Sequence, residues 1–371
     1  MDFIQYAERF GACDFAEKPF NNVDAAIFVM LSYLSWEKIA PTIYEGLNDA
    51  RSFAHVSDDD IKKMLNCSSL SEKAAEVFSC IRKTARYRDV SAGCVMNILD
   101  GEVLEQFFAV TFHIPSVCSF ISYRGTDSTM IGWRENVSII TKNVMVANLD
   151  GVEYLHQVVP AVSEKNDVPV FIGGHSKGGN ISCYTYLHSP KVIRDMIEKV
   201  YSFDGLGFFN KDFMNIECYG EFLKKFIQIL PEASVVGAML YTPEKRILVK
   251  ADVKGVKQHT VFFWSIGDDG DFIYLKKRSL SSKILHRGIK YWAGKNLAED
   301  VAFFAYTLLD RFVKEEKNEN GSCEEIKRKK PGIKEKLKFF RISVSFWMSI
   351  CKSALYYSHI HAAAMLLKRK K

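Results

Sequence analysis

A serine enclosed by glycines is the part of this sequence best suited to chemistry. The segment 174–178, Gly-His-Ser-Lys-Gly, follows an apolar run at 168–172 and precedes a helix-compatible segment at 180–188. This strand, turn and helix is the context that the G-x-S-x-G turn of serine nucleophiles requires. Glycines flank the serine because a Cβ in so sharp a turn would clash with its neighbours. The spacing predicts that Ser176 projects its hydroxyl beside the backbone N–H of Lys177, which can hold an oxyanion. A structural turn without chemistry is the alternative.

A serine hydroxyl needs a base to remove its proton, so a histidine must lie within reach of Ser176. In hydrolases built around this turn the chain order is serine, acid, histidine, which directs the search to histidines after residue 176. His259 is favoured because it lies at the start of the strand-like run 261–266, just after a polar stretch that predicts a loop. His188 lies about three turns along the helix that starts at the serine, and therefore at its wrong end. The alternative for His259 is a histidine that caps a strand.

Three carboxylates could orient that histidine. Asp204 leads, because residues 200–203 read as the strand after the serine's helix and Asp204 turns off its end. Glu232 is the second candidate, since it follows the next expected strand, at 226–230, which is a more usual location for the acid. Asp252 is the third. A turn residue that bonds to backbone N–H groups is the alternative for Asp204.

A second polar turn ends another expected strand. The β-branched and aromatic run 119–123 leads into Arg-Gly-Thr-Asp at 124–127. In combination, these motifs resemble the class 3 lipases and, more closely, a family of uncharacterised bacterial lipase-like α/β-hydrolases. The resemblance rests on Tyr-Arg-Gly-Thr-Asp at 123–127 with Trp133, Gly-His-Ser-Lys-Gly-Gly-Asn at 174–180, Tyr-Ser-Phe-Asp-Gly at 201–205, Ser-Val-Val-Gly at 234–237, and Gln-His at 258–259 with Trp264.

This resemblance implies an α/β-hydrolase fold and a role for each matching residue. Ser176 would be the nucleophile, His259 the base, and Thr126 an oxyanion-hole donor beside Lys177. The acid departs from the pattern, because class 3 lipases carry an aspartate after the strand that follows the one ending at Asp204. The nearest counterpart there is Glu232, so both acids stay open. The expected reaction is two-step acyl transfer from an ester, with lipids as the favoured substrate class.

Composition is consistent with a large enzyme core. The chain has 371 residues, 48% of them hydrophobic, and exceeds the roughly 250–300 residues at which single cores stop growing. Its nine cysteines are odd in number and lack C-x-x-C spacing, which favours reduced thiols over disulfides or a zinc site. The first residues show no basic segment followed by an apolar stretch, so a cytoplasmic location is expected. No cofactor and no metal are expected.

The chain divides into three predicted parts, a helical N-terminal region at 1–85, a core at 86–275 and a helical, basic extension at 276–371. Apolar runs at 90–98, 105–112 and 117–123 begin the sheet, with Asp100-Gly101 as a hairpin turn. Helix and strand alternate after them, which predicts a mostly parallel sheet flanked by helices on both faces.

The extension carries the net charge of the protein. From Arg311 onward there are sixteen Lys or Arg against six Glu, a net charge of +10, and the overall +6 leaves −4 for the rest. Residues 315–332 predict a linker, and 342–367 an apolar helix closed by four basic residues. A helix drawn to anionic lipid, making a peripheral membrane contact, and a helix packed on the core with a solvated basic end are both open. Nucleic-acid binding is not expected, because no groove-reading fold accompanies the charge.

Two classes of function are compatible with these patterns. The first is a serine hydrolase that cleaves carboxylic esters, with a small ester or a lipid as its substrate. The second is a catalytically silent binding or scaffold protein on the same fold, in which no acid supports His259. The two differ in whether Asp204 or Glu232 meets that histidine.

Overall fold

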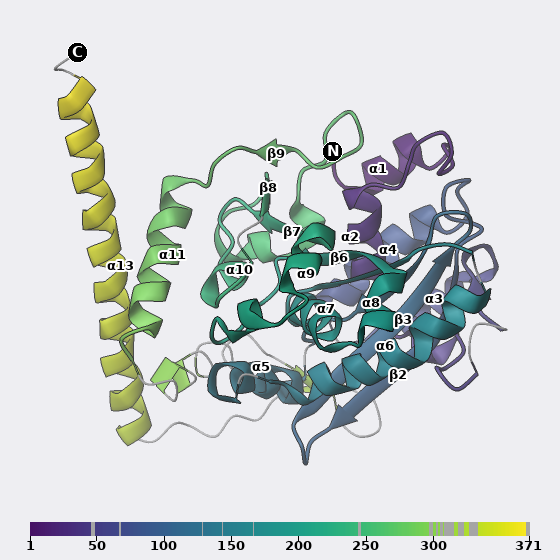
Figure 1. Cartoon of the computed structure of the whole chain (residues 1–371), viewed down its shortest axis with the longest axis horizontal. Coiled ribbons are helices and arrows are strands. Elements are labelled where there is room, and N and C mark those ends of the chain that lie inside the picture. Colours follow the sequence, from purple (N-terminus) through teal and green to yellow (C-terminus); the bar gives the residue numbers. More distant parts are fainter. Residues whose placement is uncertain are drawn as a thin grey trace.

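A single mixed sheet runs through the centre of the computed structural model, with helices on both faces (Figure 1). The structure describes residues 1–45, 49–66, 68–127, 129–142, 144–165, 167–243, 246–296, 300–301, 303–304, 307, 315–317, 323–325 and 333–368. The expected linker at 315–332 and the last three basic residues therefore lie largely outside the described residues. Within that linker, the short strands β10 (Glu315–Lys317) and β11 (Cys323–Glu325) pair antiparallel.

The order of the nine strands in the sheet follows their order in the chain. They are β1 (Arg51–Ser52), β2 (Ser91–Asp100), β3 (Glu105–Ile114), β4 (Cys118–Tyr123), β5 (Val170–His175), β6 (Ile197–Phe203), β7 (Phe226–Pro231), β8 (Ile247–Val249) and β9 (Tyr274–Leu275). Strands β4 to β8 are parallel, and the pairs at both edges are antiparallel. The expectation of a mostly parallel sheet thus holds for its centre, while the sheet as a whole is mixed.

Sequential strand order decides which helices cover which face. Right-handed crossovers between neighbouring parallel strands place their connecting helices on the same side of the sheet. These helices are α5 (Met130–Lys142), α6 (Val146–Lys165), α7 (Lys177–His188), α8 (Lys191–Met196) and α9 (Tyr219–Lys225). Their buried residues form one core cluster with inward-facing strand residues such as Phe107 and Ile172.

The N-terminal helices cover the opposite face. They are α1 (Phe3–Phe10), α2 (Asn22–Leu31), α3 (Asp58–Met64) and α4 (Ser69–Ile81). Helix α2 is apolar on nearly all sides, as expected of a helix surrounded by protein. Its Phe28 packs on Phe112 and Phe120 of the sheet, with ring centroids 5.4 and 5.9 Å apart. Successive side chains of each strand point alternately into the two cores.

Several loops between the longer helices and the strands contain short helical segments. They are the helix α10 (Val236–Met239) and the 3-10 helices η1 (Trp36–Lys38), η2 (Phe53–His55), η3 (Asp212–Asn215), η4 (Gly255–His259) and η5 (Val261–Phe263).

The prediction of a strand at 261–266 is wrong. Its first three residues form η5, and Trp264 and Ile266 make only isolated bridges, to Ala251 and Phe272. The Trp264 ring is fully buried, and its Nε1–H donates to the Gln258 carbonyl at 2.8 Å. A short apolar run reads alike for a buried turn and a buried strand, so periodicity could not separate them.

Two further helices, α11 (Leu280–Ala293) and α13 (Ile333–Lys368), pack side by side at one end of the molecule (Figure 1). Trp292 of α11 and Ile342 of α13 join the core cluster under α5–α9. The predicted apolar helix at 342–367 is the larger part of α13. Among the described helices, none is both long and apolar enough to span a bilayer.

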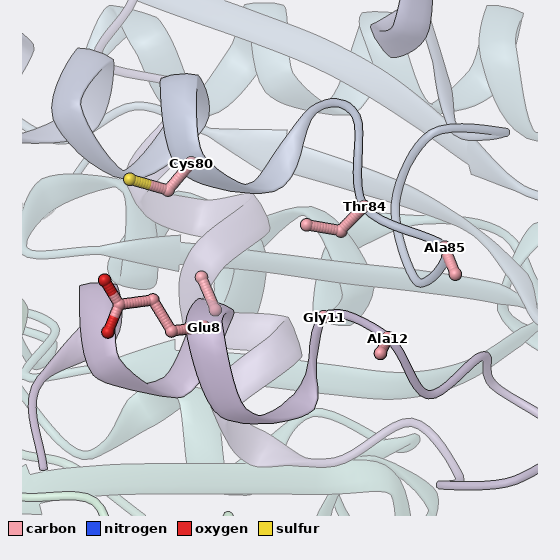
Figure 2. Close-up of a pocket in the computed structure, with 7 residues that line it drawn as sticks. Glu8, Gly11, Ala12, Cys80, Thr84 and Ala85 are labelled. Carbon is pink, nitrogen blue, oxygen red and sulfur yellow. The ribbon is translucent and has the colours of Figure 1, made fainter.

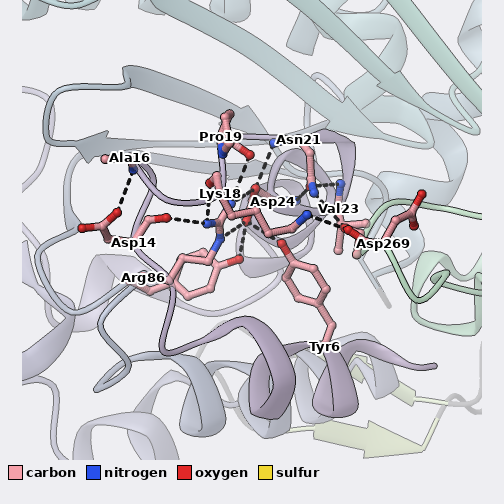
Figure 3. Close-up of polar contacts among 12 residues, drawn as sticks. Tyr6, Asp14, Ala16, Lys18, Pro19, Asn21, Val23, Asp24, Arg86 and Asp269 are labelled. Atoms are coloured by element: carbon pink, nitrogen blue, oxygen red, sulfur yellow. Dashed lines mark hydrogen bonds and ion pairs between the residues drawn. The ribbon is translucent and has the colours of Figure 1, made fainter.

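A buried ion pair fastens the N-terminal helices to one another (Figure 3). Arg86 donates two hydrogen bonds to Asp24 of α2, at 2.8 and 2.6 Å, and both side chains are fully buried. Tyr6 of α1 and Tyr87 donate to the same carboxylate, at 3.2 and 2.5 Å. The Asn21 N–H adds a fifth bond at 2.9 Å, so the buried charge is fully partnered.

We expect Arg86→Met to destabilise the protein by about 3–5 kcal/mol, because it leaves the Asp24 carboxylate buried without its counter-charge. Urea unfolding measures this directly. Arg88→Met is the matched control, since Arg88 is exposed and its loss should change the free energy of unfolding by no more than about 0.5 kcal/mol. Equal stability of the two variants would contradict the importance of this pair.

Candidate active site

Ser176 lies in a strained turn between β5 and α7. Its φ of 58° and ψ of −122° place a non-glycine residue in the positive-φ region, at a cost of about 1–3 kcal/mol. The flanking glycines are required by close packing. A Cβ on Gly174 would collide with the backbone of Gly178, and one on Gly178 would collide with the Tyr123 carbonyl. The predicted sharp turn between strand and helix is therefore present.

The ends of β5 and β6 bring Ser176 and Asp204 to the same edge of the sheet. His175 pairs with Phe203 in the parallel register, so the serine and the aspartate are the first residues beyond neighbouring strands. The Ser176 N–H donates to the Phe203 carbonyl at 3.1 Å, and the Ser176 carbonyl accepts from Leu206 N at 3.1 Å. Asp204 also has a positive φ, of 43°.

Asp204 and His259 form a short hydrogen bond. The His259 Nδ1 lies 2.7 Å from Asp204 Oδ2. The other carboxylate oxygen accepts from the Ser234 hydroxyl and from Gly237 N. Because an ionised carboxylate can only accept, Nδ1 carries the proton and Nε2 is left as the basic nitrogen. Asp204 is completely buried, while the His259 side chain is 27% exposed.

The other two candidate acids lie elsewhere. Glu232 follows β7, and its N–H donates to the Val249 carbonyl at 3.0 Å. The Asp252 carboxylate accepts from the Ser265 hydroxyl at 2.7 Å. Of the three carboxylates, Asp204 is the one that the structure brings to His259. His188 stacks on Tyr184 at the far end of α7.

Tyr33 and His175 form a relay of hydrogen bonds behind His259. His175 Nε2 lies 2.8 Å from the His259 carbonyl, and His175 Nδ1 lies 2.8 Å from the Tyr33 hydroxyl. Burial, together with the nearby charge of His259, holds the pKa of His175 well below its usual value. A neutral His175 donates from Nε2 to the carbonyl and accepts at Nδ1 from Tyr33. The relay therefore fixes the backbone of His259 without adding a competing charge.

Arg124 holds the backbone on both sides of Tyr33. Its guanidinium donates to the Ser32 carbonyl at 2.5 Å and to the Leu34 carbonyl at 2.7 Å. It also lies over the Phe108 ring, 3.5 Å from the centroid, and is buried. The arginine of the 124–127 motif is thus a clamp on the chain around Tyr33. Sequence reasoning missed Tyr33, because no local pattern links the N-terminal region to the serine turn.

Thr126 lies on the loop that faces the serine turn. A Cβ on the preceding Gly125 would lie 3.2 Å from the Ser176 Cβ, which shows how closely the loop approaches. The Thr126 hydroxyl oxygen accepts from Asn136 Nδ2 at 2.6 Å. Its own proton therefore remains available for donation. The Trp133 side chain, part of the same motif, lies outside what the structure describes.

The backbone and the side chain of Lys177 have different roles. As the first residue of α7, its N–H has no acceptor within the helix. Its side chain is fully buried. The ammonium contacts the Gln106 carbonyl, Gln106 Oε1 at 2.8 Å and Glu135 Oε2 at 2.7 Å. The sequence drew attention only to the N–H, whereas the side chain ties α7 to β3 and α5.

Glu105 is influenced by the charges of Asp150 and of the Glu135–Lys177 pair. Burial, followed by a hydrogen bond with Asp150 and the charges of Asp150 and Glu135, raises its pKa to about 8, while Lys177 acts in the opposite direction. The folded protein therefore holds a proton on this carboxyl that the unfolded chain releases near pH 4.5. Its contribution to stability is full below that pH and is lost as the pH rises to about 8.

We expect Glu105→Gln to remove this dependence on pH. The variant should match the wild type near pH 5 and become progressively more stable than it toward pH 9, since glutamine has no proton to lose. Urea unfolding at several pH values is the measurement. Curves of stability against pH that stay parallel would contradict the raised pKa.

A separate cavity of about 330 Å³ lies between α1 and the end of α4 (Figure 2). It is lined by Ala7, Glu8, Gly11, Ala12, Cys80, Thr84 and Ala85. Burial, with the charges of Glu8 and Glu76, raises the pKa of the Cys80 thiol, so it is not an activated nucleophile. No group of three metal-ligating side chains occurs within the described ranges. The residues around Ser176 remain the best candidate site.

Comparisons with known proteins found similar solved structures and one matching family model. Two solved structures are similar, each at low identity. The native propeptide complex of Rhizomucor miehei lipase is 13% identical, with a TM-score of 0.34, over 47% of this chain and 66% of that one. Lipase II from Rhizopus niveus is 12% identical, with a TM-score of 0.33, over 50% of this chain and 71% of that one.

No match to the sequence is found among curated proteins. A family model, in contrast, matches this chain. The Mbeg1-like model aligns with residues 81–309, which is more than half of the chain and includes Ser176, Asp204 and His259. The chain therefore belongs to the Mbeg1-like family.

Proposed function

We propose that this chain is a serine hydrolase that cleaves carboxylic esters on an α/β-hydrolase fold, with Ser176, His259 and Asp204 as its catalytic triad. The observation that carries the proposal is the 2.7 Å bond between His259 Nδ1 and the buried carboxylate of Asp204. It supplies the orienting acid beside the strained serine turn, as the chemistry requires.

The reaction begins with attack of the Ser176 hydroxyl oxygen on the ester carbonyl carbon. His259 Nε2 takes the hydroxyl proton, and the Asp204 carboxylate stabilises the resulting imidazolium. The tetrahedral intermediate collapses when His259 returns this proton to the leaving alcohol oxygen. Water then attacks the acyl-enzyme, losing a proton to His259, and the acid product leaves as Ser176 regains its proton. A neutral His175 next to this imidazolium adds no repulsion.

Two donors are assigned to the oxyanion that forms in each half of the reaction. The first is the N–H of Lys177 at the start of α7, where the helix dipole also favours negative charge. The second is Thr126, through its N–H or its hydroxyl, whose oxygen is already occupied by Asn136. Each such donor typically contributes about 10²–10³ in turnover.

The scaffold alternative depends on a histidine without an acid. The Asp204–His259 bond favours the enzyme over the scaffold. The positive φ of Ser176 also favours it, since backbone strain of this kind clusters at functional sites. Lipid esters are the favoured substrates, given the resemblance of the motifs to lipases. A cytoplasmic location stays a prediction.

Labelling with a fluorophosphonate probe, which reacts with activated serines, tests the proposal. We expect the wild type to be labelled and Ser176→Ala to remain unlabelled, because the probe bonds covalently to the nucleophile. Ser281→Ala is the matched control, since it removes an exposed serine on α11 and should be labelled like the wild type. Thermal unfolding establishes that all three proteins are folded.

Two results would contradict the proposal. Labelling that persists in Ser176→Ala would place the nucleophile elsewhere. A folded wild type that takes no label and hydrolyses no ester of short or long acyl chain would favour a binding role.

A further inference from the structure

Helix α13 has two apolar faces, of which only one is packed. The inner face contacts α11 and the core: Phe346 lies 5.3 Å from Trp292 and 5.1 Å from Phe304, measured between ring centroids. Gly288 of α11 leaves no room for a Cβ beside Ile350. Buried serines at 349 and 353 continue this face toward the C-terminus.

The opposite face is apolar and exposed. Its residues, which we call the outer face of α13, are Ile333, Leu337, Phe340, Val344, Trp347, Met348 and Leu355. Spacings of three, four and seven residues place them in one stripe along the helix. Exposed fractions of 78% for Ile333, 67% for Phe340 and 62% for Trp347 show that the stripe is uncovered. It extends over about 33 Å, given 1.5 Å of rise per residue.

Basic side chains border the outer face. Helix α13 carries six Lys or Arg and one Glu, so its net charge is +5. At helical spacing, Lys334, Arg341 and Lys352 lie along one side of the stripe, and Lys336 lies along the other. An apolar strip with aromatic residues, bordered by cations, is the pattern of a helix that lies in a membrane interface.

We propose that the outer face of α13 docks the protein on a membrane surface rich in anionic phospholipid, with the helix parallel to the bilayer. The apolar stripe would enter the boundary between headgroups and acyl chains, and the bordering cations would meet the phosphates and carboxylates of the lipids. The helix does not need to cross the bilayer for this, in keeping with its hydropathy.

Charge complementarity favours lipid over a second copy of this chain. Two outer faces pressed together would bring the bordering Lys and Arg side chains of both copies close to one another, where like charges repel. An anionic surface neutralises the same cations.

Arg278, just before α11, is buried enough that its pKa is lowered, while the nearby charges of Asp204 and of Tyr357 on α13 oppose this shift. One guanidinium thus lies within electrostatic range of both the triad acid and the C-terminal helix. Docking through α13 would bring the protein to a surface made of lipid esters, which extends the proposed function.

Sedimentation of the full chain with vesicles tests the inference. We expect the wild type to bind vesicles of phosphatidylcholine mixed with phosphatidylserine, and to bind pure phosphatidylcholine vesicles far more weakly. Leu337→Ser with Trp347→Ser should weaken binding by at least about tenfold, because each loses an apolar contact with lipid. Lys334→Gln and Lys336→Gln should each cost about fivefold on the anionic vesicles.

A matched control removes exposed apolar residues of other helices. Leu149→Ser with Val192→Ser, on α6 and α8, changes side chains that are 56% and 61% exposed and should leave vesicle binding unchanged. Ser176→Ala should bind like the wild type, so that vesicle binding is decided independently of the proposed hydrolysis.

Three results would overturn the inference. The first is a folded wild type that does not bind the anionic vesicles. The second is an equal loss of binding in the control pair. The third is a lipid-free dimer, seen by sedimentation equilibrium, that Leu337→Ser with Trp347→Ser dissociates, because the outer face would then be occupied by a second copy.

Discussion

Strand order constrains almost everything else in this molecule. Because each parallel strand is followed in the sheet by its successor in the chain, right-handed crossovers place α5–α9 on one face and leave the other bare. The N-terminal helices must cover that face, and in doing so they carry Tyr33 to His175 at the edge where β5 and β6 end. A segment that looks like a peripheral helical region is therefore part of the candidate site's support, held in place by Arg124.

Three buried carboxylates are each paired with a basic side chain. Asp24 and Arg86 join the N-terminal helices, Glu135 and Lys177 join α5 to α7, and Asp204 meets His259. Each carboxylate has several donors, as burial requires. The first two pairs are structural. The third differs because its histidine is partly exposed and keeps one ring nitrogen without a partner among the contacts that the structure describes, which is the condition for a general base.

Much of the central sheet could be predicted from sequence, since the runs at 105–112, 117–123 and 226–230 correspond to β3, β4 and β7. Apolar strands that end in glycine-rich or acidic turns leave a clear local pattern. Other features left none. The run 261–266 carried the same apolar pattern without forming a strand, and Tyr33 lies 143 residues before Ser176, so only the folded chain relates them. The choice between Asp204 and Glu232 likewise required geometry, because both follow strands of the parallel centre.

The rate of fluorophosphonate labelling in two acid variants tests the triad most directly. Asp204→Asn keeps the shape of the side chain but lets His259 adopt the wrong tautomer, and it should slow labelling by about 10⁴. Glu232→Gln alters the alternative acid and should leave the rate unchanged. The reverse result, with Glu232→Gln slow and Asp204→Asn unaffected in folded proteins, would contradict the assignment of Asp204 as the acid that orients His259.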